Sequence, residues 1–357
     1  MKVIYISGPD SIGKASNIRL LEGCGLKGVG KLSGLDISFD WCLKDPSGQE
    51  FCDYVIECLK RRQSLMSEGS YIVDGGILMF KFVCLAMNEM KGGPKKQQDR
   101  EYILERFSEE FGAVLEILLL YDLDVNNSVQ TLQERSKDFT SERKTYQYSL
   151  MDFLIKNMKE FSHVVISKTR SIIDINNEIR EVISSKMRLN IKPLLSRVKL
   201  VVGLGGLSES GKSTLGMMLA ERNFVRMKIG YLLDDTCERE NNEERRAETI
   251  VKSLDKFSRC HYYYNLYSIE SLHRDEESRY LKKLMGERYL VIYTEASEET
   301  RIARYKGDAQ GVKEKDVIKR SRGAHKIKES CDVFIDTDRT SIQEETRIVE
   351  ERIARYL

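Results

Sequence analysis

The sequence predicts an α/β protein of two tandem domains, each a parallel β-sheet with helices on both faces. Three observations support this prediction. Short apolar runs typical of buried strands alternate with segments of helical periodicity along the chain. A glycine-rich pattern follows the first apolar run of each half. Pro193 interrupts the chain before the second half begins, so we expect domains at 1–190 and 197–357.

Length and composition are those of a globular protein. The chain has 357 residues, enough for two cores, and its hydrophobic (41%) and charged (32%) contents exclude a disordered protein. The net charge of +2 gives no reason to expect nucleic acid or a membrane surface as a partner. Eight scattered cysteines without a C-x-x-C pair fit reduced thiols, so we expect a cytoplasmic protein. The four histidines are isolated and predict no zinc site.

The strongest motif is Gly206–Thr214, which has the form G-x-x-x-x-G-K-[ST]. It follows the apolar run Leu200–Val202 and opens into a helical pattern, as a phosphate-binding loop requires. Glycines let backbone N–H groups turn toward phosphate oxygens, and the helix N-terminus adds its dipole. Lys212 would reach the β- and γ-phosphates of ATP, and the Ser213 hydroxyl would bind Mg²⁺. The nucleotide-binding residues predicted here are Gly206, Ser208, Glu209, Ser210, Gly211, Lys212, Ser213 and Thr214.

A second pattern of this kind follows the predicted strand Val3–Ser7, with one departure. Its glycines and lysine have the expected spacing, but Ala15 replaces the residue whose hydroxyl should bind Mg²⁺. Ser16 comes one residue late and could substitute imperfectly. The alternative is a turn that binds no nucleotide. If the loop does bind a nucleotide, the residues are Gly8, Asp10, Ser11, Gly13, Lys14 and Ser16.

Further strands and helices alternate through the first half. Asp74 ends a buried strand beside the phosphate loop, where an acid commonly holds Mg²⁺. The alternative is an N-cap for the helix that starts near Ile77. In chain order we expect a loop at Leu26–Leu35, a helix at Phe51–Glu68, strands at Tyr71–Asp74 and Val114–Tyr121, a helix from Ser128, a helix at Thr145–Phe161, a strand at His163–Ser167 and a helix at Ile172–Ser185.

The second half repeats this plan after its own phosphate loop. Because strands again alternate with helices, we expect a second parallel sheet. The predicted elements are strands at Asn223–Ile229, His261–Asn265, Tyr289–Tyr293 and Val333–Asp336, with a charged helix at Asn241–Phe257.

About 185 residues of the first half resemble thymidylate kinase. The segments that carry the resemblance are Gly8–Asp10 with Gly13-Lys14, Arg61–Gln63, Tyr71–Asp74 and Tyr121–Val125. The resemblance implies acceptor-binding roles for Asp10, Arg61 and Asp74, and it allows a homodimer. An arginine that the family has after the third element is missing from Asp74-Gly75-Gly76. With Ala15, this departure weighs against catalysis by the first half.

The second half resembles dephospho-coenzyme A kinase and the archaeal adenylate-kinase-like enzymes. In these families, arginines between the fourth and fifth strands form a lid over the phosphates. The resemblance implies that role for Arg304, Arg320 and Arg322. The segments that carry it, besides the phosphate loop, are Ser268–Leu272, Ala296–Arg304 and Ser330–Asp336.

One departure concerns an acid at the end of the third strand. The third strand of these relatives usually ends in Asp-Gly-x-Arg. At the end of the predicted strand His261–Asn265 this chain has Tyr264-Asn265-Leu266-Tyr267 instead. The acid expected to help position Mg²⁺ or the acceptor is therefore missing. Asp234 or Asp235 could supply it.

These observations favour tandem nucleotide-kinase-like domains with small-molecule nucleotides as partners. The leading hypothesis is ATP- and Mg²⁺-dependent phosphoryl transfer to a nucleoside monophosphate or a related small phosphorylated acceptor. The second half would drive it, with Lys212, Arg304 and Arg320 as catalytic residues. The alternative is a regulatory or scaffold protein that keeps one nucleotide site without turnover. A nucleoside-triphosphate hydrolase doing mechanical work is less favoured, because the sequence has no recognisable paired sensor arginines.

Overall fold

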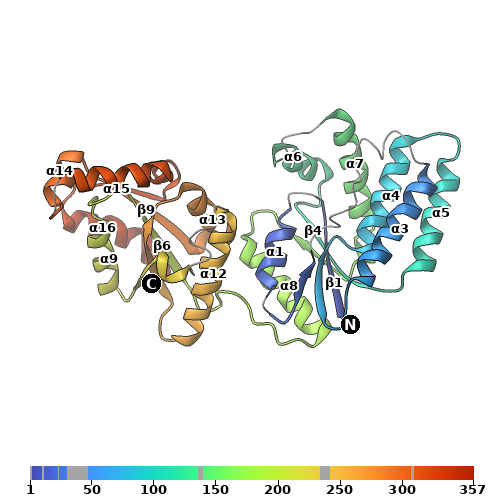
Figure 1. Ribbon diagram of the computed structural model, residues 1–357, viewed down its shortest axis with the longest axis horizontal. Helices are drawn as coiled ribbons and strands as arrows, with labels where there is room; N and C mark the ends of the chain where they lie inside the picture. Colours follow the sequence, from blue (N-terminus) through green and yellow to red (C-terminus); the bar gives the residue numbers. More distant parts are fainter. Residues whose placement is uncertain are drawn as a thin grey trace. The chain divides into compact units, whose positions relative to one another are not determined.

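Two five-stranded parallel β-sheets, one in each half of the chain, confirm the predicted α/β class (Figure 1). The computed structural model describes residues 2–9, 12–22, 24–29, 47–135, 140–233, 242–306 and 309–357. The chain divides into two units, Met1–Pro193 and Leu194–Leu357.

In the first unit the strand order is β2-β3-β1-β4-β5, and all pairs are parallel. The central strand is β1, which leads directly into the first phosphate-loop pattern. The strands are β1 (Lys2–Ser7), β2 (Lys27–Val29), β3 (Ser70–Asp74), β4 (Leu115–Leu120) and β5 (His163–Ile166). The helices are α1 (Lys14–Leu21), α3 (Gly48–Ser64), α4 (Ile77–Lys91), α5 (Lys96–Glu110), α6 (Val125–Arg135), α7 (Ser141–Lys156) and α8 (Ile172–Met187), with a 3₁₀ turn η1 (Met158–Glu160).

Helices cover both faces of this sheet. Successive side chains of each strand point to opposite faces, so the apolar strands contribute to a core on each face. Ile4 and Ile6 of β1 pack in one core, which includes Ile179 of α8. Tyr5, between them, packs in the opposite core, which includes Phe82 of α4. Each core is a continuous layer of buried apolar side chains.

The second unit repeats this topology. Its strand order is β10-β9-β6-β8-β7, again parallel throughout. Counted from the first strand of each unit, both orders read 2-3-1-4-5. The strands are β6 (Leu200–Gly205), β7 (Val225–Lys228), β8 (Leu266–Leu272), β9 (Tyr289–Glu295) and β10 (Val333–Asp336). The helices are α9 (Lys212–Glu221), α10 (Ile229–Leu232), α12 (Glu243–Cys260), α13 (Asp275–Met285), α14 (Glu298–Arg304), α15 (Ala309–Ser321) and α16 (Ile342–Ile353), with 3₁₀ turns η2 (Gly286–Arg288), η3 (Ala324–Ser330) and η4 (Ala354–Tyr356).

Two element predictions are wrong. The predicted loop Leu26–Leu35 contains the edge strand β2, which pairs with β3; a strand of three residues around Gly28 is too short to show alternation. The predicted third strand His261–Asn265 is a turn, and the strand begins at Leu266. The tyrosines have β-propensity, but their side chains are 46–79% exposed, so no burial holds them in a sheet.

Candidate functional site

The second phosphate loop has the backbone that its motif predicts. Gly206 and Gly211 have φ angles of +140° and +101°, in the region that glycine alone adopts without strain. A Cβ atom on Gly206 would lie 2.5 Å from the carbonyl oxygen of Thr294 on β9. Helix α9 begins at Lys212, so its first N–H groups face the loop. The loop is therefore a concave array of donors at the end of the central strand.

Lys212 folds back over this loop. Its Nζ donates to the carbonyl oxygen of Gly206 at 2.9 Å, to that of Leu207, and to Ser210 Oγ at 3.3 Å. Burial lowers the pKa of Lys212 to about 7, and the neighbouring charge of Lys319 acts in the same direction. A bound anion would offset both effects, as expected of a phosphate-binding lysine.

A cleft of about 710 Å³ opens over the loop. The structure brings Lys212, Ser213 and Arg304 together there. Arg304 donates to Thr337 Oγ1 at 2.9 Å and to the carbonyl oxygen of Glu209 at 3.4 Å, which holds it beside the loop. Of the predicted loop residues, all but Gly206 line this cleft, together with Lys228, Glu270, Ser271, His273, Arg304, Lys315, Lys319, Thr337, Ile342 and Glu345.

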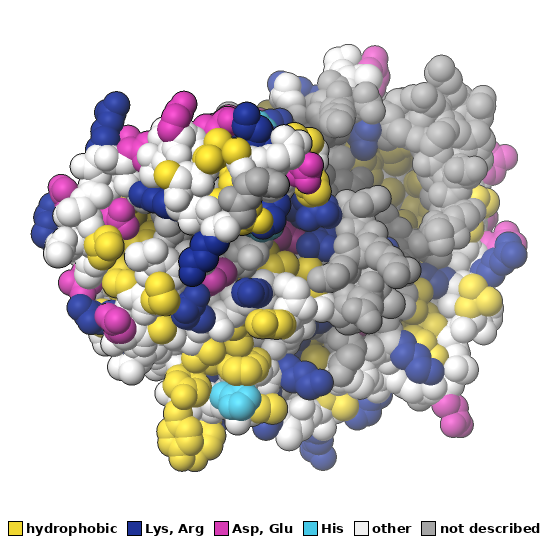
Figure 2. Space-filling model, turned by 60° about the vertical axis from the view of Figure 1, so that its left-hand side comes forward, with side chains coloured by type: hydrophobic (Ala, Val, Ile, Leu, Met, Phe, Trp, Pro, Cys, Tyr) yellow, Lys and Arg dark blue, Asp and Glu magenta, His cyan; other side chains and the backbone are white. Residues whose placement is uncertain are grey.

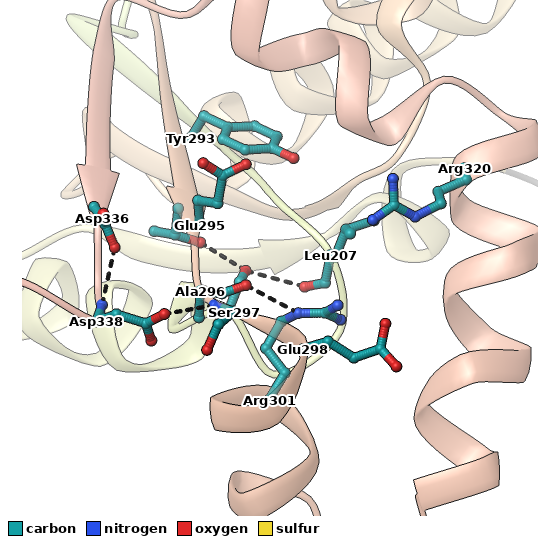
Figure 3. A pocket seen from close by; sticks show the side chains of 12 residues that line it. Leu207, Tyr293, Glu295, Ala296, Ser297, Glu298, Arg301, Arg320, Asp336 and Asp338 are labelled. Carbon is teal, nitrogen blue, oxygen red and sulfur yellow. Dashed lines mark hydrogen bonds between the residues drawn. The ribbon is translucent and has the colours of Figure 1, made fainter.

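Arg320 lies elsewhere, on the other side of the loop. It lines a separate pocket of about 360 Å³ together with Leu207 and Arg301. Figure 3 shows its side chain extending from α15 toward Leu207. Arg322 lines neither pocket. The residues of α15 that do reach the main cleft are Lys315 and Lys319, and the Nζ of Lys319 donates to Ser208 Oγ at 2.9 Å. Sequence reasoning missed Lys319, although its spacing of three from the buried Asp316 places both on one helix face.

Ser208 is held by three side chains of α14 and α15, a set of contacts that we call the Ser208 clasp. Its N–H donates to Asp316 Oδ1 at 3.0 Å, its carbonyl oxygen accepts from Arg301 at 3.3 Å, and its hydroxyl accepts from Lys319. Arg301 and Asp316 also form a buried ion pair. Although burial opposes ionisation, the Ser208 amide and Arg301 hold the pKa of Asp316 below its usual value. The clasp fixes α14 and α15 to the loop Gly206–Thr214.

The third strand of the second unit does carry an acidic residue, Glu270. It lies near the end of β8, one residue after Ile269, which pairs with Gly203 of the central strand. Its Oε1 accepts from Arg226 at 2.7 Å. A Cβ atom on Gly216 would lie 2.0 Å from the same oxygen, so this glycine makes room for the carboxylate against α9. Placing the third strand too early hid Glu270; Asp234 and Asp235 lie outside the described residues.

Glu270 is followed by a strained residue. Ser271 has a φ of +70°, and the register between β6 and β8 shifts at this point. In the first unit Asp74 pairs with Ile6, and Gly75 after it has a φ of +77°. Both units place an acid at the same edge of the sheet.

The first phosphate loop has nearly the same backbone. Gly8 and Gly13 have φ angles of +140° and +95°. Lys14 Nζ donates to the carbonyl oxygens of Gly8 and Pro9 at 2.8 and 2.7 Å. Ala15 is exposed, as Ser213 is in the second unit, whereas Ser16 is 94% buried, with 6% exposed. Asp10 and Ser11 lie outside the described residues.

The arginines of α3 differ from the arrangement that the family resemblance implies. Arg61 is exposed, and the structure does not bring it to Asp74. Arg62 is buried instead and donates to the carbonyl oxygens of Asp74 and Gly75 at 3.0 and 2.7 Å. The N-cap of α4 is Gly76, so the alternative reading of Asp74 as that cap is wrong. Arg62 and Asp74 occupy the sheet edge beside the first loop.

Comparison with known proteins gives partial structural similarity. No family model matches the sequence, and no curated protein matches it. An uncharacterized protein from Eubacterium ventriosum ATCC 27560 has a TM-score of 0.34 at 11% identity, covering 44% of this chain and 99% of that one. Thymidylate kinase from Candida albicans has a TM-score of 0.40 at 16% identity, covering 53% and 93%. Neither similarity assigns a function to this chain.

The second site can accommodate a polyanion and a metal ion bound with it. Three cations line the cleft beside the N–H donors of the loop: Lys212, Lys319 and Arg304. Elsewhere on the face that Figure 2 shows, acidic and basic side chains are interspersed. No three His, Cys, Asp or Glu side chains in the described ranges are arranged to hold a metal ion. The exposed hydroxyl of Ser213 fits a Mg²⁺ ion that phosphate oxygens hold in part. None of the described helices is long and apolar enough to cross a membrane.

Proposed function

We propose that the second unit binds ATP with Mg²⁺ and transfers the γ-phosphoryl group to a nucleoside monophosphate or a related small phosphorylated acceptor. The observation that supports this most is the cleft in which Lys212, Ser213, Arg304 and Lys319 meet over a left-handed glycine loop. Such a transfer needs little covalent chemistry from the protein. It needs in-line positioning and offset of the charge that develops on the phosphoryl oxygens.

Each residue of the cleft has a role in this proposal. The loop N–H groups and Lys212 bind the β- and γ-phosphates, and Ser213 is a ligand of Mg²⁺. Arg304 and Lys319 face the transferred group and offset its charge in a cleft that excludes part of the water. Arg320 lies on the far side of Leu207, so we give Lys319 the lid role that the sequence assigned to Arg320.

The first unit is proposed to bind a nucleotide weakly or to support the second. Ala15 offers no hydroxyl for Mg²⁺, so this loop lacks a ligand that the second has. Asp10, Arg61 and Asp74 as acceptor-binding residues, and the homodimer, stay predictions from the family resemblance. Arg62 is a second candidate there because its guanidinium lies beside Asp74.

A regulatory nucleotide-binding protein is the second candidate function. The Ser208 clasp favours it, because two helices already held on the phosphate loop could report its occupancy. Such a protein would bind ATP and turn it over slowly or not at all.

Acceptor-dependent ATP consumption separates the two functions. Purified protein with Mg²⁺ is assayed against nucleoside monophosphates and dephospho-coenzyme A, beside Lys212→Ala and the matched variant Lys14→Ala. We expect turnover that requires an acceptor, falls by about 100-fold or more in Lys212→Ala and persists in Lys14→Ala. ATP binding without turnover on any acceptor would favour the regulatory function. Turnover that needs no acceptor would indicate a hydrolase.

A further inference from the structure

His273 lies at the point where β8 ends and before α13 begins. It lines the same cleft as Lys212, Ser213 and Glu270. Its Nδ1 atom is buried and has no hydrogen-bond partner within the described part of the chain. An imidazole is a group that can accept a proton near neutral pH.

The charged side chains that act on His273 are cationic. Lys212 on α9, Lys319 on α15 and Arg322 after α15 all act on it electrostatically. The nearby acids are neutralised: Glu270 accepts from Arg226 at 2.7 Å, and Asp275 on α13 pairs with Arg279 at 3.0 Å. Burial, with the charges of the three cations, lowers the pKa of His273 to about 3, although a backbone hydrogen bond with Leu272 opposes this shift. The imidazole is therefore neutral when the cleft holds no anion.

Resting on the function proposed above, we propose that His273 accepts the proton of the acceptor's attacking hydroxyl, and that bound triphosphate makes it basic enough to do so. The negative charges of the triphosphate lie among Lys212, Lys319 and the loop N–H groups. They offset the cations that otherwise oppose protonation of the imidazole. Proton acceptance is thus coupled to the presence of the phosphoryl donor.

The proposed step balances in atoms and charge. The acceptor oxygen forms a bond to the γ-phosphorus, and the bond from that phosphorus to the β,γ-bridging oxygen breaks. ADP leaves with the electron pair of that bond, and the hydroxyl proton passes to an imidazole nitrogen of His273. A phosphate acceptor would need no such base at neutral pH. Of the acceptors proposed above, His273 therefore serves the small phosphorylated compounds that react through a hydroxyl group, and not a nucleoside monophosphate that reacts through its phosphate.

Other groups of the cleft are less suited to this role. The carboxylate of Glu270 is engaged by Arg226. Glu209 lies on the loop, where its backbone contacts Arg304, and Glu345 lies on α16 after the fifth strand. His273 follows β8 directly and lines the same cleft as the loop.

Proton uptake on ATP binding tests this coupling without knowing the acceptor. If ATP raises the pKa of His273 from about 3 toward its ordinary value, the complex binds more protons than the free protein between about pH 4 and 6. Lys212 titrates near pH 7, so it is largely protonated in both states in that window. Calorimetric titrations with Mg-ATP at pH 5.5, in two buffers of different ionisation enthalpy, count the protons taken up.

The variants are His273→Asn and His273→Gln, with exposed His261→Asn as the matched control. We expect wild type and His261→Asn to take up about half a proton or more per ATP beyond either His273 variant. A proton NMR titration of the wild type gives a second readout: the imidazole signal lost in His273→Asn should titrate at higher pH with ATP bound. The titration itself is followed on the wild-type protein, and His273→Asn serves only to identify the signal.

Equal uptake in all variants, or an unmoved NMR titration, would overturn the inference and leave the proposed function intact. If the wild type bound no ATP at all, the proposed function would fail and the inference with it. Loss of ATP binding in Lys212→Ala shows that the binding measured is at this cleft.

Discussion

Ser271 shows how one residue positions others. Its left-handed backbone costs about 1 kcal/mol or more for a residue with a side chain. The turn it makes ends the strand between Glu270 and His273, two residues that line the cleft. Gly75 makes the same turn without strain in the first unit. The strained residue thus occurs in the second unit, whose loop also carries the Ser213 hydroxyl.

We expect Ser271→Gly to keep or slightly raise the stability of the second unit. Relief of about 1–2 kcal/mol of backbone strain is partly offset by the extra entropy of glycine in the unfolded chain. Ser271→Val should lower the free energy of unfolding by more than 1 kcal/mol, because a β-branched residue is poorly tolerated at positive φ. Urea denaturation measures both. A destabilised glycine variant would show that the hydroxyl, and not the backbone, matters here.

Lys212 provides a prediction on pH. Its pKa is about 7 in the folded protein and about 10.5 when unfolded, so between these values the unfolded chain binds more protons. The stability of the second unit should therefore rise with pH from about 7 to 10 through this group. In Lys212→Met that contribution should vanish, whereas the exposed control Lys199→Met should keep it. Thermal unfolding across this range measures the difference. If the stability of Lys212→Met changed with pH in the same way as that of the wild type, the lowered pKa of Lys212 would be contradicted.

At the scale of elements, the Ser208 clasp joins two helices to the loop. Arg301 and Asp316 are both almost fully buried, so each depends on the other for neutralisation. Removing the carboxylate charge would leave a buried guanidinium without its counter-ion. The same change would weaken the acceptor for the Ser208 N–H.

Asp316→Asn should therefore loosen α15. We expect a loss of about 1–3 kcal/mol in stability and faster amide exchange over residues 309–321. The exposed control on the same helix, Glu314→Gln, should change neither. Hydrogen exchange with mass spectrometry measures this. Unchanged exchange in Asp316→Asn would mean that other contacts hold the helix.

The elements show which signals the sequence carries. The buried strands β1, β3, β4, β6 and β9 are continuous apolar runs and could be predicted directly. Strand β8 could not, because Ser268 and Glu270 interrupt it while three exposed tyrosines nearby mimic a strand. The loop between β6 and α9 could be predicted from the spacing of its glycines and lysine, whereas phosphate binding there stays a prediction. Which of Lys319 and Arg320 faces the cleft depends on helix rotation, and the sequence of the lid does not fix it.

At the scale of the whole chain, one plan is used twice. Both units have the strand order 2-3-1-4-5, the same pair of left-handed glycines, and an acid at the end of the third strand. Among the differences between their loops is Ala15 against Ser213, at the position where a hydroxyl would bind Mg²⁺. The two motifs could be predicted from sequence. Their equivalence at the third strand could not, because it required the position of β8.

Calorimetric titration with Mg-ATP decides whether the loop Gly206–Thr214 binds a triphosphate. Wild type, Lys212→Ala and Lys14→Ala together give the affinity and the number of sites. We predict one Mg²⁺-dependent site per chain that is lost in Lys212→Ala and kept in Lys14→Ala. Binding that survives Lys212→Ala and disappears in Lys14→Ala would place the site in the first unit instead.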